Sequence, residues 1–146
     1  MARIVLTDVS VVFGASDDLS DHIASVTLSS SYDVLETTAF AGGNPGGYGT
    51  GAAKSRIAGL VDNSVTFEFH QDYAASEVDA ILSAALGGTL ACKVKPTTGA
   101  VSATNPEYQF TCLVSEYAPL SGAVGELATV SVTWPIVGAI TKDVTP

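Results

Sequence analysis

The sequence feature that most constrains the fold is a glycine-rich segment that runs from Phe40 to Ala53. It reads FAGGNPGGYGTGAA and contains six glycines, but its only large side chains are Phe40 and Tyr48. Glycine reaches backbone conformations that other residues avoid, and it loses much conformational entropy when it is ordered. Loops of this length within a compact domain are uncommon and are usually functional or disordered. We therefore interpret the segment as a docking arm held by another subunit, the alternative being a mobile surface loop.

Composition favours one all-β domain with its own core. The chain has 146 residues, of which 47% are apolar, and it is rich in valine and threonine. Short apolar runs recur between clusters of Gly, Pro, Asn and Ser, which is typical of strands joined by turns. Charged residues make up 14% of the chain, whereas about a quarter is usual in soluble domains. This low share indicates that partners cover part of the surface.

Alternation of apolar and polar residues predicts several strands. Val65, Phe67 and Phe69 alternate with polar neighbours, as expected for a strand that is buried on one face. Residues 62–64, Asp-Asn-Ser, read as a turn before that strand. The tail at 138–146 is expected to be extended. The full set of expected strands is 3–7 with 9–13, 23–28 continuing at 32–38, 65–70, 89–95, 108–115 and 127–134, and residues 56–61 are short and partly apolar.

One helix is expected to begin at Ser76. The run Ser-Glu-Val-Asp that starts there resembles a capping box, and two glycines at 87–88 end the pattern. The apolar stripe of this helix should pack over one face or an open end of the β structure. Its apolar residues recur at helical spacing, at Val78, Ile81, Leu82, Ala85 and Leu86.

The charge of the chain excludes several kinds of partner. The net charge is −9, and the six basic residues form no run that would hold a nucleic-acid backbone. The N-terminus resembles a first strand more than a signal peptide, and no stretch reaches the length of a transmembrane helix. We therefore expect no specific binding of nucleic acid, no membrane insertion, and synthesis in the cytoplasm.

Two groups of residues invite a chemical interpretation. Residues 17–22 place three carboxylates beside His22, which could ligate a hard cation, but the EF-hand spacing is missing, so we interpret them as a solvated turn. His70 and Asp72 could be a general base and its orienting carboxylate, but no nucleophile-elbow pattern accompanies them. The glycine-rich segment also lacks the Gly-Lys-Ser/Thr of a phosphate-binding loop. We expect no catalytic residues, no cofactor and no metal.

Three other residues are expected to be buried. Cys92 and Cys112 occupy apolar positions of two predicted strands and should be free thiols, since a disulfide needs an oxidising compartment and close Cβ atoms. Trp134 lies at the end of the last long strand beside Pro135. We assign it to the core or to a subunit contact.

Several segments together resemble the tail tube (major tail) proteins of long-tailed, siphovirus-type bacteriophages. They are SYDVLETTAF before the glycine-rich segment, RIAGLVDNSVTFEFHQD after it, then SEVDAILSAALGG and YAPLSGAVGELATVSVTWPIVGAIT. This resemblance extends over almost the whole chain. It implies an all-β fold with one flanking α-helix, a β-sandwich or barrel of the tail tube type with a long glycine-rich loop, in a single domain over 1–146. It further implies hexameric rings that stack into a tube for DNA delivery.

The resemblance also implies which parts of the chain touch other subunits. The stacking arm would span 37–54, and residues 1–7 and 138–146 would contact the next ring. The partners would be further copies of the chain, tape-measure and tail-terminator proteins, and DNA that passes through the lumen without specific binding. The protein would lie in the virion tail after assembly in the host cytoplasm. The implied arm residues are Thr38, Phe40, Asn44, Pro45, Tyr48 and Lys54, and the implied terminal contacts are Arg3, Ile140 and Lys142.

Physical reasoning supports self-assembly and leaves two other functions open. Exposed strand edges invite aggregation, and a closed ring pairs them with a neighbouring subunit. A capsid decoration or other virion accessory protein would share the acidic, β-rich composition. A surface- or carbohydrate-binding β-sandwich module would use an aromatic side chain such as Tyr48 or Tyr117. An enzyme is not expected.

Overall fold

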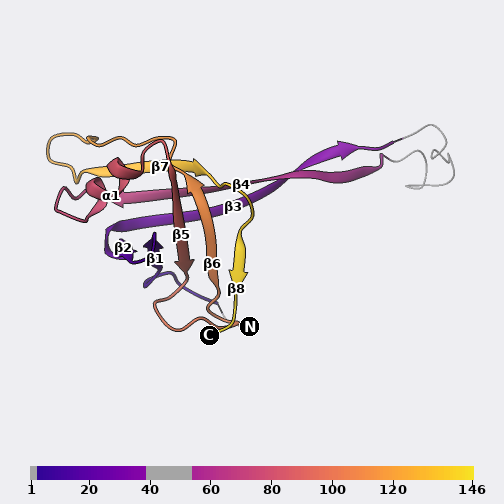
Figure 1. Cartoon of the computed structure of the whole chain (residues 1–146), viewed down its shortest axis with the longest axis horizontal. Helices are drawn as coiled ribbons and strands as arrows, with labels where there is room; N and C mark the ends of the chain where they lie inside the picture. Colours follow the sequence, from indigo (N-terminus) through magenta and orange to yellow (C-terminus); the bar gives the residue numbers. More distant parts are fainter. Residues whose placement is uncertain (1–2, 39–53) are drawn as a thin grey trace. The chain divides into compact units, whose positions relative to one another are not determined.

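The structure of the chain is a computed structural model that describes residues 3–38 and 54–146. It divides into two compact units, which are Met1–Ser29 with Asn63–Pro146 (unit 1) and Ser30–Asp62 (unit 2). The elements are β1 (Ser10–Phe13), β2 (Asp17–Asp18), the 3-10 helix η1 (Ser20–His22), β3 (Ile23–Glu36), β4 (Arg56–His70), α1 (Val78–Ala85), β5 (Thr89–Lys95), β6 (Glu107–Leu113), β7 (Thr129–Pro135) and β8 (Thr141–Asp143) (Figure 1).

The strands form two sheets, as the sequence predicts for an all-β fold with one helix. One sheet has five strands in the order β2-β1-β5-β6-β8, and the other has the order β3-β4-β7. The pairs within the five-stranded sheet are antiparallel, and so is the pair of β4 with β7, which runs from Ser64 opposite Pro135 to His70 opposite Thr129. Among the described residues, no helix is long and apolar enough to cross a membrane.

Both sheets and α1 contribute to one hydrophobic core in unit 1. The predicted alternation on β4 is confirmed, because Val65, Phe67 and Phe69 are fully buried. Phe67 packs edge-on against Phe13, with ring centroids 5.4 Å apart, and against Trp134 at 5.9 Å. The indole nitrogen of Trp134 donates a hydrogen bond to the Glu116 carbonyl at 2.9 Å. Trp134 therefore has the predicted core position, with its polar atom satisfied.

The predicted helix is present, but it begins two residues later than expected. Glu77 is the N-cap, and no side chain makes a capping hydrogen bond. Ser76 adopts a positive φ of 65°, so the expected capping box does not form. Val78 and Leu82 are fully buried, which confirms that the apolar stripe packs against the β structure. The glycine at 87, with φ of 83°, then turns the chain into β5.

The turn expected at 62–64 is wrong, because β4 continues through these residues. Asn63 is only 5% exposed, and its amide donates a hydrogen bond to the Gly138 carbonyl at 3.1 Å. Its own carbonyl accepts a hydrogen bond from the Ile136 amide at 2.9 Å. Tertiary partners thus satisfy a residue type that usually favours turns, and the strand runs on.

The two chain ends of unit 1 compare differently with expectation. The strand expected at 3–7 does not form, since β1 begins at Ser10. At the other end, the tail expected to be extended contains the edge strand β8, in which Lys142 lies opposite Tyr108 of β6. An apolar sequence alone does not make a strand, because a strand also needs a neighbour with free hydrogen-bonding groups.

The two cysteines are free and buried, as predicted. Their Sγ atoms lie 3.4 Å apart on the adjacent strands β5 and β6. The hydrogen bond with Cys112, together with burial, raises the pKa of the Cys92 thiol. The Cys92 side chain is therefore favoured as the neutral thiol over the thiolate.

Candidate assembly surface

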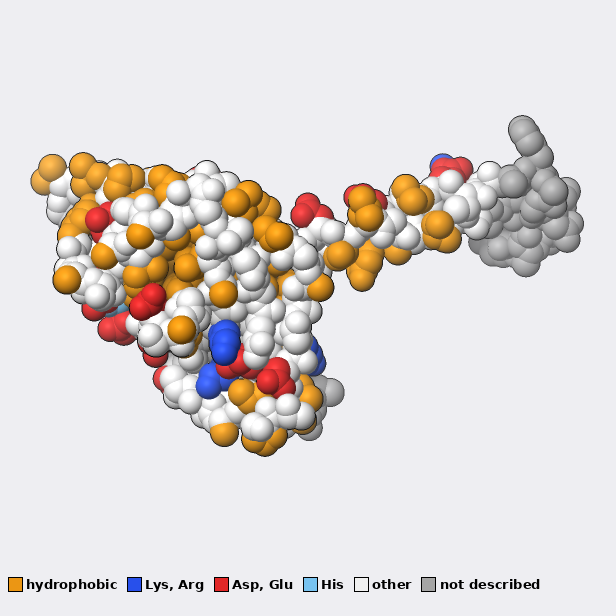
Figure 2. Space-filling view, viewed as in Figure 1, with side chains coloured by type: hydrophobic (Ala, Val, Ile, Leu, Met, Phe, Trp, Pro, Cys, Tyr) orange, Lys and Arg blue, Asp and Glu red, His pale blue; other side chains and the backbone are white. Residues whose placement is uncertain are grey.

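Unit 2 consists of the strand segments on both sides of the glycine-rich segment, and it exposes many large apolar side chains. Figure 2 shows these side chains along the hairpin. Leu60 is 80% exposed, Val34 is 69% exposed and Tyr32 is 62% exposed. Soluble proteins rarely expose a contiguous apolar surface unless it binds a partner. We call this surface the apolar ribbon, and its residues are Tyr32, Val34, Leu35, Ile57, Leu60 and Val61.

The apolar ribbon has side chains on both faces. Side chains alternate along a strand, so Tyr32 and Val34 share one face of β3 while Leu35 lies on the other. Gly59 of β4 belongs to the Leu35 face, since a Cβ built on Gly59 would lie 3.2 Å from the Leu35 side chain. A two-stranded hairpin is marginally stable by itself in water. This ribbon therefore needs a covering partner, and covering one face alone would leave the other exposed.

Polar contacts close unit 2 next to the residues that the structure leaves undescribed. The Thr37 amide donates a hydrogen bond to the Ser55 carbonyl at 2.8 Å, and the Ser55 amide donates to Thr38 Oγ1 at 2.9 Å. Lys54 Nζ lies 3.5 Å from a Glu36 carboxylate oxygen. These contacts hold residues 37–38 beside residues 54–55, just beyond the ends of β3 and β4.

The predicted contact residues divide into three groups. Thr38 and Lys54 lie at the end of the hairpin in unit 2, whereas Arg3, Ile140 and Lys142 lie in unit 1. Arg3 and Lys142 are exposed, but Ile140 packs partly against the core. The remaining predicted arm residues, Phe40, Asn44, Pro45 and Tyr48, lie outside the described residues.

Besides the apolar ribbon of unit 2, unit 1 has an exposed apolar region of its own, which was not predicted. It lies on the long connection between β6 and β7, where Leu120 is 84% exposed and Val124 is fully exposed. The start of this connection is fixed, because the side chains of Gln71 and Tyr73 both donate hydrogen bonds to the Pro119 carbonyl. These apolar residues show no strand or helix periodicity, so only their apolar character could have indicated an exposed surface.

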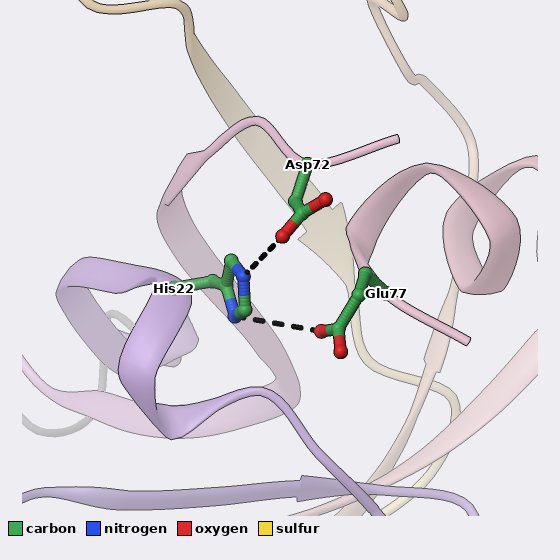
Figure 3. A group of neighbouring side chains, drawn as sticks. All are labelled: His22, Asp72 and Glu77. Atoms are coloured by element: carbon green, nitrogen blue, oxygen red, sulfur yellow. Dashed lines mark hydrogen bonds and ion pairs between the residues drawn. The ribbon is translucent and has the colours of Figure 1, made fainter. Parts of the chain in front are cut away.

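A cluster of titratable side chains in unit 1 surrounds His22 (Figure 3). His22 Nε2 lies 2.9 Å from Asp72 Oδ2, and His22 Nδ1 lies 2.8 Å from Asp21 Oδ1 and 3.7 Å from Glu77 Oε2. Burial opposes the charged imidazole, but the hydrogen bonds with Asp72 and Asp21 outweigh it and raise the pKa of His22. Hydrogen bonds from the Ala74 amide and from His22 lower the pKa of Asp72.

This cluster changes the interpretation of both chemical motifs found in the sequence. Asp72 pairs with His22 and not with His70, and the Nδ1 atom of His70 is buried with no hydrogen-bond partner among the described residues. Asp17 and Asp18, which were considered as cation ligands or a solvated turn, form the short strand β2 beside β1. His22 thus belongs to a group of side chains that the sequence did not indicate, because its partner Asp72 lies fifty residues away along the chain.

Comparison with solved structures finds chains that share this fold. No protein-family model matches the sequence, and no curated protein matches it. A chain in the virion of a native gene transfer agent particle has a TM-score of 0.65 and 12% identity, over 93% of this chain and 95% of that chain. A chain in the C6-symmetric tail of an empty gene transfer agent particle has a TM-score of 0.56 and 14% identity, over 82% of this chain and 81% of that chain.

The third similar structure comes from another kind of particle. A chain in the extended sheath-tube complex of an extracellular contractile injection system has a TM-score of 0.65 and 10% identity, over 98% of this chain and 93% of that chain. At these low identities, the similarities show a shared fold. The fold that the resemblance to tail tube proteins implies is therefore confirmed.

Proposed function

We propose that the chain is a structural subunit of a virion tail tube, in which hexameric rings stack into a conduit for DNA delivery. The observation that carries this proposal is the apolar ribbon of unit 2. Its large side chains are solvent-exposed in a single copy, and they lie on both faces of a hairpin that needs a partner. Further copies of the same chain on both sides would cover them.

The shared fold supports the choice of a tube over other assemblies. The similar chains belong to a gene transfer agent virion, a C6-symmetric tail and a sheath-tube complex. Six-fold rings are therefore the assembly we propose for this chain. Stacking rings head to tail is a heterologous contact, and such contacts build open filaments.

We assign the stacking contact to residues 37–54 and their flanking strands within one domain of 1–146. Thr38 and Lys54 stand at the described ends of this arm, and Phe40, Asn44, Pro45 and Tyr48 are proposed to continue it. Arg3, Ile140 and Lys142 are proposed as further contacts between rings. In the virion, tape-measure and tail-terminator proteins would complete the tail, which is assembled in the host cytoplasm.

The net charge of −9 supports a role as a conduit. DNA and the tube wall would repel each other, so DNA would pass through without being held. The described basic residues are few, and Lys54 is already paired with Glu36. A tube lined by lysine and arginine would instead retain the DNA.

The proposal is tested by deleting residues 42–51 and imaging the purified protein by negative-stain electron microscopy. We expect the native chain to form stacked rings or hollow tubes and the deletion variant to remain dispersed. Shortening the loop changes closure entropy only slightly, so the deletion variant should keep its native circular dichroism spectrum and thermal midpoint.

Two results would count against the proposal. Native protein that stays dispersed at high concentration would favour an accessory role on the virion over a tube. A deletion variant that unfolds would place residues 42–51 in the core of the subunit rather than in a contact between subunits.

A further inference from the structure

We propose that His22, Asp72 and Glu77 form a binding site for a divalent transition-metal ion such as Zn²⁺, with Asp21 orienting the imidazole. The proposal concerns unit 1 alone and does not depend on the tube assembly. It rests on ligand atoms that three separate segments bring together, as Figure 3 shows. His22 ends η1, Asp72 follows β4, and Glu77 is the N-cap residue of α1.

The spacing of the ligand atoms fits a metal ion. One ligand atom from each of His22, Asp72 and Glu77 lies within 4.8 Å of the other two. In a tetrahedral site with bonds of about 2.1 Å, ligand atoms lie about 3.4 Å apart. The two carboxylate side chains are about one-third exposed, so small rotations can close the remaining distance. Water would complete the coordination.

The hydrogen bonding of His22 leaves room for a cation. Both ring nitrogens face carboxylates, yet a neutral imidazole has only one N–H to donate. Its second nitrogen needs either a second proton, which makes the ring cationic, or a metal ion in the place of that proton. Glu77 adds a third carboxylate and, among the described residues, receives no hydrogen bond on its side chain. A metal ion bound to Nε2 would balance these charges.

Asp21 has the position of an orienting partner. Its Oδ1 lies 2.8 Å from His22 Nδ1, on the opposite side of the ring from the Asp72 contact. Histidine ligands usually donate their other N–H to a carboxylate or a carbonyl, which fixes the tautomer and the ring orientation. In this arrangement Nδ1–H donates to Asp21, and Nε2 and Asp72 face the metal. The Glu77 side chain, whose Oε2 lies 3.7 Å from Nδ1, would turn toward Nε2 to complete the set.

The ligand chemistry selects the kind of metal. Imidazole suits Zn²⁺ and other late first-row ions, whereas Ca²⁺ and Mg²⁺ prefer sites built from oxygen ligands alone. One imidazole with two carboxylates therefore favours a transition-metal ion. This set differs from the one considered in the sequence, where only residues 17–22 were grouped.

The experiment is titration calorimetry of the full chain with ZnCl₂, at protein concentrations that keep it dispersed. We expect saturable binding of one Zn²⁺ per chain and a higher thermal midpoint with Zn²⁺, because the ion binds the folded state. Replacing His22→Gln should abolish both effects. Asp72→Asn should weaken binding at least tenfold, and loss of the orienting partner in Asp21→Asn should weaken it roughly tenfold to a hundredfold.

Matched controls separate this site from other binding. Asp17→Asn removes one nearby exposed carboxylate outside the cluster, and His70→Gln removes the other histidine, so both should retain native affinity. With Co²⁺ as a spectroscopic probe, a thiolate charge-transfer band would assign binding to Cys92 and Cys112 and would overturn the proposal. So would the absence of saturable Zn²⁺ binding to the native chain, or undiminished binding in a folded His22→Gln variant.

Discussion

Replacing Val34 and Leu60 together by serine is expected to prevent tube assembly while leaving the subunit folded. These side chains are 69% and 80% exposed, so their removal takes little away from the fold of a single copy. If assembly buries both, their loss removes about 3 kcal/mol of apolar burial per subunit contact. The concentration needed for assembly should therefore rise on the order of a hundredfold, as measured by sedimentation and electron microscopy.

A conservative variant provides the control for this prediction. Val34→Ile with Leu60→Ile keeps the apolar surface and the preference for strands, so it should assemble at the native concentration. A serine variant that assembled as readily as the native chain would show that the apolar ribbon is not a contact between subunits. Circular dichroism of both variants distinguishes lost assembly from lost folding.

Replacing Trp134 by alanine is expected to cause a large loss of stability in unit 1. Trp134 is fully buried, packs against the rings of Phe67 and Phe69, and donates a hydrogen bond to the Glu116 carbonyl. Truncating a buried tryptophan to alanine typically costs about 3–5 kcal/mol. Since domains are stable by only about 5–15 kcal/mol, this change should lower the free energy of unfolding severely, as measured by urea denaturation.

Two further variants show whether the loss of stability comes from the packing around Trp134. Trp134→Phe keeps most of the apolar volume but removes the hydrogen bond, so it should be less destabilising than Trp134→Ala. Phe67→Leu tests the same core without changing Trp134. An alanine variant with a free energy of unfolding within about 1 kcal/mol of the native value would show that Trp134 is not central to the core.

The sequence predicts most of unit 1 because its strands and helix follow simple periodicities. Val65, Phe67 and Phe69 are buried on alternate positions, and Val78 and Leu82 are buried at helical spacing. The turn at 62–64 was predicted wrongly because its residue types favour turns, whereas Asn63 has buried partners at Gly138 and Ile136. Such partners lie far along the chain, and no local pattern reveals them.

The candidate surfaces were predicted only in part. The glycine-rich segment predicts a contact between subunits at 37–54. The apolar ribbon lies instead on the flanking strands, at residues such as Tyr32 and Leu60. Alternating apolar residues look the same whether a core or a second subunit will cover them. The His22 cluster was not visible because Asp72 and Glu77 reach it through folding.

Amide hydrogen exchange measures directly whether other copies of the chain cover the apolar ribbon. Deuterium uptake of residues 30–38 and 54–62 is compared between dispersed subunits and assembled particles. We expect fast uptake in dispersed subunits, because a two-stranded hairpin is marginally stable by itself, and strong protection after assembly. Equal uptake of these residues in both states would contradict the proposed covering by other copies.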